Sequence, residues 1–137
     1  MIVSGLFIYP VKSAKGIQLD EMNFDLLGPL FDRRFMIIDE ENKMLTQREC
    51  PILSTLKTQI NFEKEELTLS IKTKSDIKEE SLSLSMKEED YKGKRSVGVQ
   101  VWRDRVEGLY CEEESELFLT KFLGRKARLI FTPQKII

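Results

Sequence analysis

Hydrophobic and polar side chains alternate with a period of two along most of the chain, which is typical of β-strands with one buried face. The clearest case runs from Leu56 to Phe62 and again from Leu67 to Ile71, with the polar residues Glu63-Lys64-Glu65 between the two segments. Because a short polar turn joins two alternating segments, the pattern predicts a β-hairpin.

Other short apolar segments predict further strands. They lie at about 2–9, 17–27, 35–38, 82–86, 97–101, 106–110 and 128–131. Pro10 ends the first of them and Gly28-Pro29 ends the second. Residues 44–46 are expected to return against 35–38, and the turn at Arg103-Asp104 joins two more strands. The polar segments 72–80 and 87–95 are expected to be exposed loops.

One segment, from about Glu112 to Leu123, predicts a helix. Glu112, Glu113 and Glu114 suit the positive N-terminal end of a helix, and Gly124 is a typical residue at a helix C-terminus. Leu119, Phe122 and Leu123 fall on one face. Many strands with one late helix predict a mainly β (α+β) fold, a β-barrel or sandwich that carries an amphipathic helix.

Length and charge limit the class of protein. A chain of 137 residues predicts a single domain, spanning 1–137. The 22 basic and 23 acidic side chains give a net charge of −1, which argues against a nucleic-acid-coating protein. Neither a secretion signal nor an apolar run of about 18 residues is present, so we expect no membrane partner and a cytoplasmic location.

The chain contains no histidine, and its two cysteines are Cys50 and Cys111. Catalytic triads and pairs that use histidine are therefore excluded, as are Cys₄ and Cys₂His₂ zinc sites. Two cysteines without a secretion signal are expected to be reduced thiols. We assign neither a catalytic residue nor a metal ligand from the sequence.

The first candidate binding loop, at residues 9–16, follows a predicted strand. It presents Lys12, Ser13 and Lys15, and Gly16 permits an unusual backbone dihedral near its end. An ammonium group beside a hydroxyl and exposed backbone amides can bind a phosphate. The alternative for this loop is a solvated turn with two surface lysines.

Two further basic points carry arginine. Arg33 and Arg34 follow Asp32 just before the strand at 35–38, and on a strand they would point to opposite faces, so at most one faces a given pocket. Arg48 lies in a predicted loop at 46–51. A guanidinium suits bidentate recognition of anions, although each arginine can equally be a surface ion-pair partner worth about 0–1 kcal/mol.

Taken in order, these segments resemble the N-terminal β-barrel domain of MOSC proteins, the molybdenum cofactor sulfurase C-terminal class. The resemblance covers essentially the whole chain. Its motifs are Tyr9-Pro10-Val11-Lys12-Ser13 with Lys15-Gly16, Gly28, Asp32-Arg33-Arg34-Phe35-Met36, Thr46-Gln47-Arg48 with Pro51-Ile52-Leu53, Val101-Trp102-Arg103-Asp104, the helix at 113–123 with Gly124, and Arg128-Leu129.

The resemblance implies a function. Proteins of this class include molybdoenzymes that reduce N-hydroxylated or related compounds and hold the molybdenum cofactor between the N-terminal barrel and a following MOSC domain. By resemblance, Lys12, Ser13 and Arg33 bind that cofactor, and Lys15 and Arg48 are further candidate pocket residues. No role is transferred to Arg34.

In that class the molybdenum-ligating cysteine lies in the downstream MOSC domain, and neither cysteine of this chain matches it. The resemblance therefore implies a domain that is not catalytic alone and binds no cofactor tightly without its partner. The expected partners are a MOSC catalytic domain, in the same chain or in trans, and an electron-transfer protein. Two alternatives stay open: a stand-alone anion-binding or protein-interaction β-barrel without molybdenum chemistry, and a related barrel whose basic loops are merely solvated.

Overall fold

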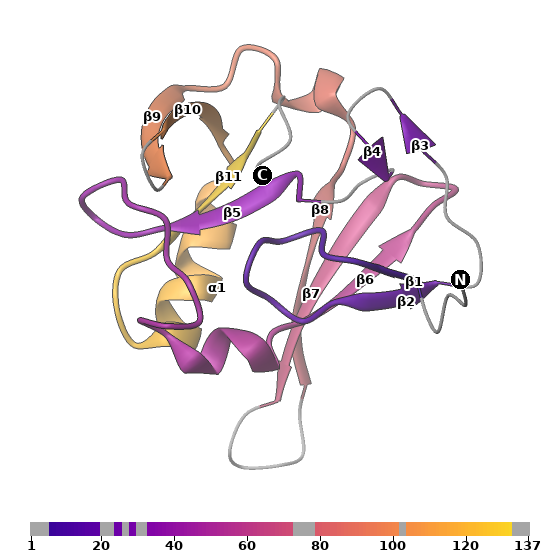
Figure 1. Cartoon of the computed structure of the whole chain (residues 1–137), viewed down its shortest axis with the longest axis horizontal. Helices are drawn as coiled ribbons and strands as arrows, with labels where there is room; N and C mark the ends of the chain where they lie inside the picture. The colour runs from indigo at the N-terminus through magenta and orange to yellow at the C-terminus, as the bar shows by residue number, and fades with distance from the viewer. Residues whose placement is uncertain are drawn as a thin grey trace, which may run out of the picture.

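The computed structural model describes residues 6–19, 24–25, 28–29, 33–72, 79–101 and 104–132 of the chain (Figure 1). Several expectations lie partly outside these residues. They are the beginning of the strand at 2–9, most of the second half of the strand at 17–27, the middle of the loop at 72–80, Asp32, and Trp102-Arg103 of the turn before residue 104.

The described residues are mostly β-strands with one α-helix, as the sequence predicts. The strands are β1 Leu6–Ile8, β2 Ile17–Leu19, β3 Phe24–Asp25, β4 Gly28–Pro29, β5 Phe35–Ile38, β6 Lys57–Asn61, β7 Glu66–Lys72, β8 Glu79–Ser85, β9 Ser96–Val101, β10 Asp104–Tyr110 and β11 Arg128–Phe131. The helices are α1 Glu113–Leu123 and the 3₁₀ helices η1 Pro51–Thr55 and η2 Glu88–Tyr91. None of the helices in the described ranges is long and apolar enough to cross a membrane.

Two antiparallel sheets make up most of the molecule. One has the strand order β6-β7-β8 and contains the predicted hairpin, in which Ile60 pairs with Leu67. The other has the order β5-β11-β10-β9. The small pairs β1-β2 and β3-β4 are the remaining sheets, and the loop between β1 and β2 lies beside β5, where Val11 forms a bridge with Phe35 (Figure 1).

The closed β-barrel expected from the resemblance does not form among the described residues, because the strands belong to four separate sheets. The β5-β11-β10-β9 sheet nevertheless curls on itself. Its two outer strands approach a common segment, since Met44 bridges Ile38 of β5 and Lys43 bridges Gln100 of β9. Residues 44–46 therefore return against β5 as predicted, but through one isolated bridge and the hydrogen bond from the Leu45 N–H to the Ile37 carbonyl rather than as a hairpin strand.

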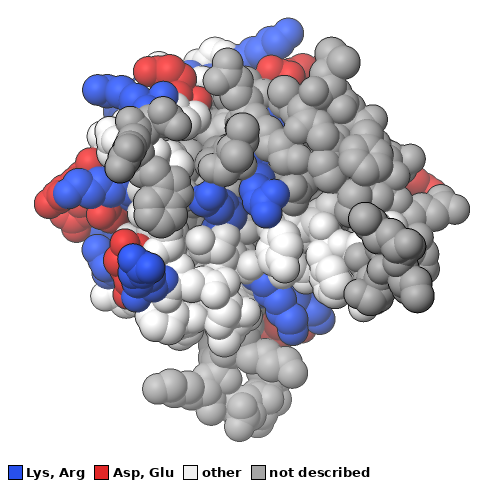
Figure 2. Space-filling view, in the orientation of Figure 1, with Lys and Arg blue, Asp and Glu red and all other residues white. Residues whose placement is uncertain are grey.

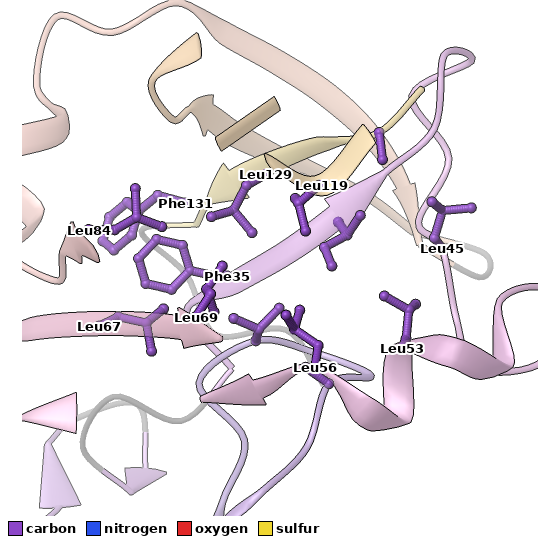
Figure 3. Close-up of a cluster of buried hydrophobic side chains, with 14 of the residues drawn as sticks. Phe35, Leu45, Leu53, Leu56, Leu67, Leu69, Leu84, Leu119, Leu129 and Phe131 are labelled. Carbon is purple, nitrogen blue, oxygen red and sulfur yellow. The ribbon is translucent and has the colours of Figure 1, made fainter. Parts of the chain in front are cut away.

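The main hydrophobic core fills the space between the two sheets and α1 (Figure 3). Phe35 and Phe131 of the curled sheet face Leu67 and Leu69 of β7, and Leu119 of α1 packs beside them; all five side chains are at most 1% exposed. A second, smaller core lies on the other face of the curled sheet. Because β5 is buried on both faces, its sequence is a continuous apolar run instead of an alternating one.

The helix matches its prediction closely. It starts at Glu113, has three acidic residues in its first turn, and ends at Gly124, whose φ of 70° places it in the left-handed region. A glycine adopts that conformation without steric cost. Leu119 is the residue of the predicted face that is fully buried, whereas Leu117 is 66% exposed.

The expectation of an exposed loop at 87–95 is wrong for Tyr91. This side chain is only 4% exposed, and its ring stacks on Phe131 with the two ring centroids 4.4 Å apart. Helix η2 carries Tyr91 inward, and the tyrosine hydroxyl donates a hydrogen bond to the Ser85 carbonyl. A single aromatic residue in a charged segment has no periodicity, so the pattern could not reveal this burial.

Candidate functional site

A cavity of about 620 Å³ opens beside the loop that joins β1 to β2. Four separate segments contribute to it: the loop after β1, the turn before β5, the segment between β5 and η1, and strand β9. Its lining residues are Tyr9, Lys12, Ser13, Ala14, Arg33, Lys43, Met44, Thr46, Gln47, Arg48, Glu49 and Gln100.

Backbone pairing brings the first two segments together. The Lys12 N–H donates to the Phe35 carbonyl at 2.9 Å, the Arg33 N–H donates to the Tyr9 carbonyl at 2.7 Å, and the Phe35 N–H donates to the Pro10 carbonyl at 3.0 Å. Val11 also forms a parallel bridge with Phe35. These bonds hold the side chains of Lys12 and Arg33 at the same cavity, although the two residues are well separated in the chain.

Two of the residues that line the cavity have a positive φ without being glycine. Ser13 has a φ of 74° and Arg33 a φ of 52°. The Ala14 N–H donates to the Val11 carbonyl at 3.2 Å, so Ser13 occupies the third position of a β-turn, where a positive φ is normally supplied by glycine or asparagine. Such backbone strain is concentrated at functional sites in proteins.

The ring of Tyr9 lies against the backbone of Gly16. A Cβ atom at Gly16 would come within 2.6 Å of the Tyr9 Cε1 atom. The expectation that Gly16 provides an unusual dihedral is therefore wrong, since Gly16 has no positive φ and its role is close contact with the ring. The Arg33 guanidinium carbon lies 5.8 Å from the centre of the same ring, which is within the range of a cation–π contact.

The third segment is a turn stabilised by one carboxylate. Glu49 Oε2 accepts hydrogen bonds from the Thr46 N–H at 2.9 Å and from the Thr46 hydroxyl at 2.8 Å. These bonds lower the pKa of the Glu49 carboxyl, because they stabilise its charged form. The turn places Gln47 and Arg48 at the cavity, and Gln47 Nε2 donates to the Ser13 carbonyl at 2.7 Å.

The cavity is rich in positive charge. Lys12, Arg33, Lys43 and Arg48 line it, and among the described lining residues Glu49 is the only acidic one. Burial and the nearby Arg33 guanidinium lower the pKa of the Lys12 ammonium group. Lys12 forms no ion pair with a described residue, so its charge is not neutralised there. In Figure 2, basic side chains occupy the middle of the face, and most acidic atoms lie toward its rim.

Four of the five residues singled out in the sequence come together at this cavity: Lys12, Ser13, Arg33 and Arg48. Lys15 does not line it; its side chain is exposed, and its backbone bonds to Leu56 and Thr58 instead. Arg34 lines a different cavity with Glu65 and Lys87, which agrees with the expectation that adjacent arginines face different pockets. Arg33 lies in a turn before β5, however, and not on the strand itself.

Sequence reasoning did not single out Tyr9 or Gln47 as site residues. Tyr9 directly follows a strand, and its ring fits at the cavity because Gly16 has no side chain. A pattern of apolar and polar residues does not reveal such a contact. Gln47 contacts a residue 34 positions away in the chain. The signal that was present is local: Thr46 and Glu49 have the spacing of a capping box, which indicates a tight turn at Gln47 and Arg48.

The donor set of this cavity fits an anionic group such as a phosphate ester, because it combines ammonium, guanidinium and hydroxyl donors. Neither cysteine lines it. Cys50 is buried with Arg125 Nη1 3.9 Å from its Sγ atom, and burial raises the pKa of the Cys111 thiol to about 12. Within the described ranges, no group of three or more acidic or cysteine side chains could hold a metal ion. The residues present therefore fit the organic, phosphate-bearing part of a cofactor and offer no thiolate to a metal at the cavity.

Comparison with known proteins identifies the family. Residues 1–126 match the MOSC N-terminal β-barrel domain, so the chain belongs to that domain family. The resemblance noted from the sequence is thereby confirmed.

The individual relatives are larger proteins. A molybdenum cofactor sulfurase from Danio rerio is 31% identical over 128 residues, which are 93% of this chain and 15% of the relative. Mitochondrial amidoxime-reducing component 1 from Mus musculus is 38% identical over 72 residues, which are 50% of this chain and 21% of the relative. The chain thus spans only a small part of the length of these relatives.

A solved structure supports the fold alone. The solution structure of a protein from Bordetella bronchiseptica superposes with a TM-score of 0.55 at 15% identity, and the match covers 80% of this chain and 84% of that one. At this level of identity the likeness extends to the arrangement of the strands and not to the site.

Proposed function

We propose that this domain forms one wall of the pocket that binds the molybdenum cofactor in a MOSC-type oxidoreductase acting on N-hydroxylated or related compounds. In this proposal Lys12, Ser13 and Arg33 bind the phosphate of the pterin, and Arg48 extends the same positively charged surface. The single observation that carries the proposal is the convergence of these four side chains, from three separate segments, on one cavity with little acidic lining.

The chemistry of the site supports an anionic ligand. Burial lowers the pKa of the Lys12 ammonium group, and the nearby Arg33 guanidinium lowers it further. The two cations therefore repel each other at the cavity. A bound phosphate would remove that repulsion and accept hydrogen bonds from both groups and from Ser13. The planar ring of Tyr9, at the same cavity, suits stacking against a heterocycle such as a pterin.

The names of the relatives support the choice of cofactor, since one is a molybdenum cofactor sulfurase and another an amidoxime-reducing component. In this proposal bound molybdenum would supply the redox chemistry, and a thiolate ligand for it would come from outside the residues of this cavity. We therefore infer that the domain is not catalytic by itself. Its partners in this proposal are a MOSC catalytic domain and an electron-transfer protein, and its compartment is the cytoplasm.

The test uses a matched pair of ligands, 6-(hydroxymethyl)pterin phosphate and the phosphate-free 6-(hydroxymethyl)pterin, titrated into the 137-residue chain by pterin fluorescence. We expect the phosphate ester to bind more tightly and the double variant Lys12→Ala/Arg33→Ala to lose that preference. The control is the double variant Lys57→Ala/Arg105→Ala, which removes the same charge from exposed residues that do not line the cavity. This variant should keep the wild-type preference for the phosphate ester.

Two results would count against the proposal. If the wild type does not distinguish the two pterins, the cavity does not bind a phosphate ester. If inorganic phosphate displaces the pterin phosphate at equal concentration, the site recognises anions in general, and a stand-alone anion-binding domain becomes the better description.

A further inference from the structure

The Ser13 turn is strained, and it needs support from elsewhere in the chain. Its φ of 74° lies in the region that a residue with a Cβ atom enters only at a cost. Within its own turn, the bond that holds it is the one from the Ala14 N–H to the Val11 carbonyl, at 3.2 Å. The Ser13 hydroxyl forms no hydrogen bond to any described residue, so it remains available to a ligand.

The support comes from Gln47. Its side-chain amide donates to the Ser13 carbonyl at 2.7 Å, which is shorter than the bond inside the turn. The segment that carries Gln47 is itself held in place, because Leu45 and Cys50 on either side are buried and the Cys50 N–H donates to the Thr46 carbonyl at 2.9 Å. The Thr46–Glu49 hydrogen bonds close the same turn.

We propose that Gln47 is a positioning residue of this site, holding the Ser13 peptide plane in the orientation that directs the Ser13 hydroxyl toward a bound phosphate. This inference rests on the proposed function, because it assumes that Ser13 contacts the ligand. Gln47 acts through its bond to the carbonyl of Ser13. Its side chain is exposed, so it contributes little to the hydrophobic core.

The experiment is a double-mutant cycle on the 137-residue chain, read out by the affinity for 6-(hydroxymethyl)pterin phosphate. Gln47→Met keeps the length of the side chain and removes its donor. We expect it to weaken binding about 5-fold, as for the loss of one hydrogen bond. In the Ser13→Ala background, which lacks the hydroxyl, the same substitution should change the affinity less than about 2-fold.

Gln59→Met is the matched control, since Gln59 is exposed on β6 and does not line the cavity. It should leave the affinity unchanged. Thermal unfolding of each variant checks that the fold is kept, and Gln47→Met is expected to unfold close to the wild-type temperature.

The outcomes separate the inference from the proposed function. If Gln47→Met weakens binding equally with and without the Ser13 hydroxyl, Gln47 contacts the ligand directly and the positioning role is wrong. If Gln47→Met has no effect while Lys12→Ala/Arg33→Ala abolishes the phosphate preference, the positioning role again fails but the proposed function stands. If neither variant changes binding, the failure lies in the proposed function.

Discussion

Replacing Ser13 with glycine should make the protein more stable and its phosphate binding weaker. A left-handed conformation costs a residue with a Cβ atom about 1–2 kcal/mol, and glycine avoids this cost. Glycine also loses about 0.5–1 kcal/mol more backbone entropy on folding. With Ser13 at a φ of 74°, the net expectation is a gain of about 0.5–1 kcal/mol in the free energy of unfolding.

The two effects are measured separately. For a domain of this size the gain corresponds to a rise of about 2–5 °C in the midpoint of thermal unfolding, followed by circular dichroism. Loss of the hydroxyl removes a hydrogen bond to a charged group, worth about 1.5–3 kcal/mol. The affinity for 6-(hydroxymethyl)pterin phosphate should therefore fall about 10- to 100-fold.

Glu65→Gly provides the control. Glu65 also has a positive φ, of 50°, but it lies in the β6–β7 turn and does not line the candidate site. It should gain stability without any change in affinity. The reasoning is refuted if Glu65→Gly stabilises the protein and Ser13→Gly destabilises it, because the strain at Ser13 would then not exist. Unchanged affinity in Ser13→Gly would refute the role of the hydroxyl.

Two further perturbations test the surroundings of the site. Gly16→Ala places a Cβ atom against the Tyr9 ring and should lower the free energy of unfolding by about 1 kcal/mol, because the tyrosine side chain is displaced from its rotamer. The Tyr9 ring resonances in NMR spectra should shift, and unaltered resonances would show that no contact exists. Glu49 has a lowered pKa in the folded protein, so the stability it contributes is present above its unfolded pKa and is lost as the pH falls through the folded value. In urea unfolding, Glu49→Gln should accordingly be less stable than the wild type at about pH 7 and as stable as the wild type at about pH 2. A difference in stability that persists at the lower pH would contradict this expectation.

The sequence predicted the local elements because local patterns determine them. Alternation at 56–71 yields the β6–β7 hairpin, and the acidic first turn with Gly124 delimits α1. Burial of Tyr91 was not predicted, since it depends on stacking against Phe131, a residue far along the chain. Closure of a barrel was expected from the resemblance and is absent from the described residues, where residues 42–45 link the two outer strands of the curled sheet.

The sequence by itself determined the chemical character of the site: no histidine, two cysteines, and basic residues beside a serine in short loops. Only the tertiary structure decided which of those residues meet. Lys12 and Arg33 lie at one cavity because the backbone at 9–12 bonds to that at 33–35, whereas Lys15, three residues after Lys12, does not line it. A side chain's type is fixed by the sequence, but its neighbours depend on long-range backbone hydrogen bonds and packing, which local patterns do not encode.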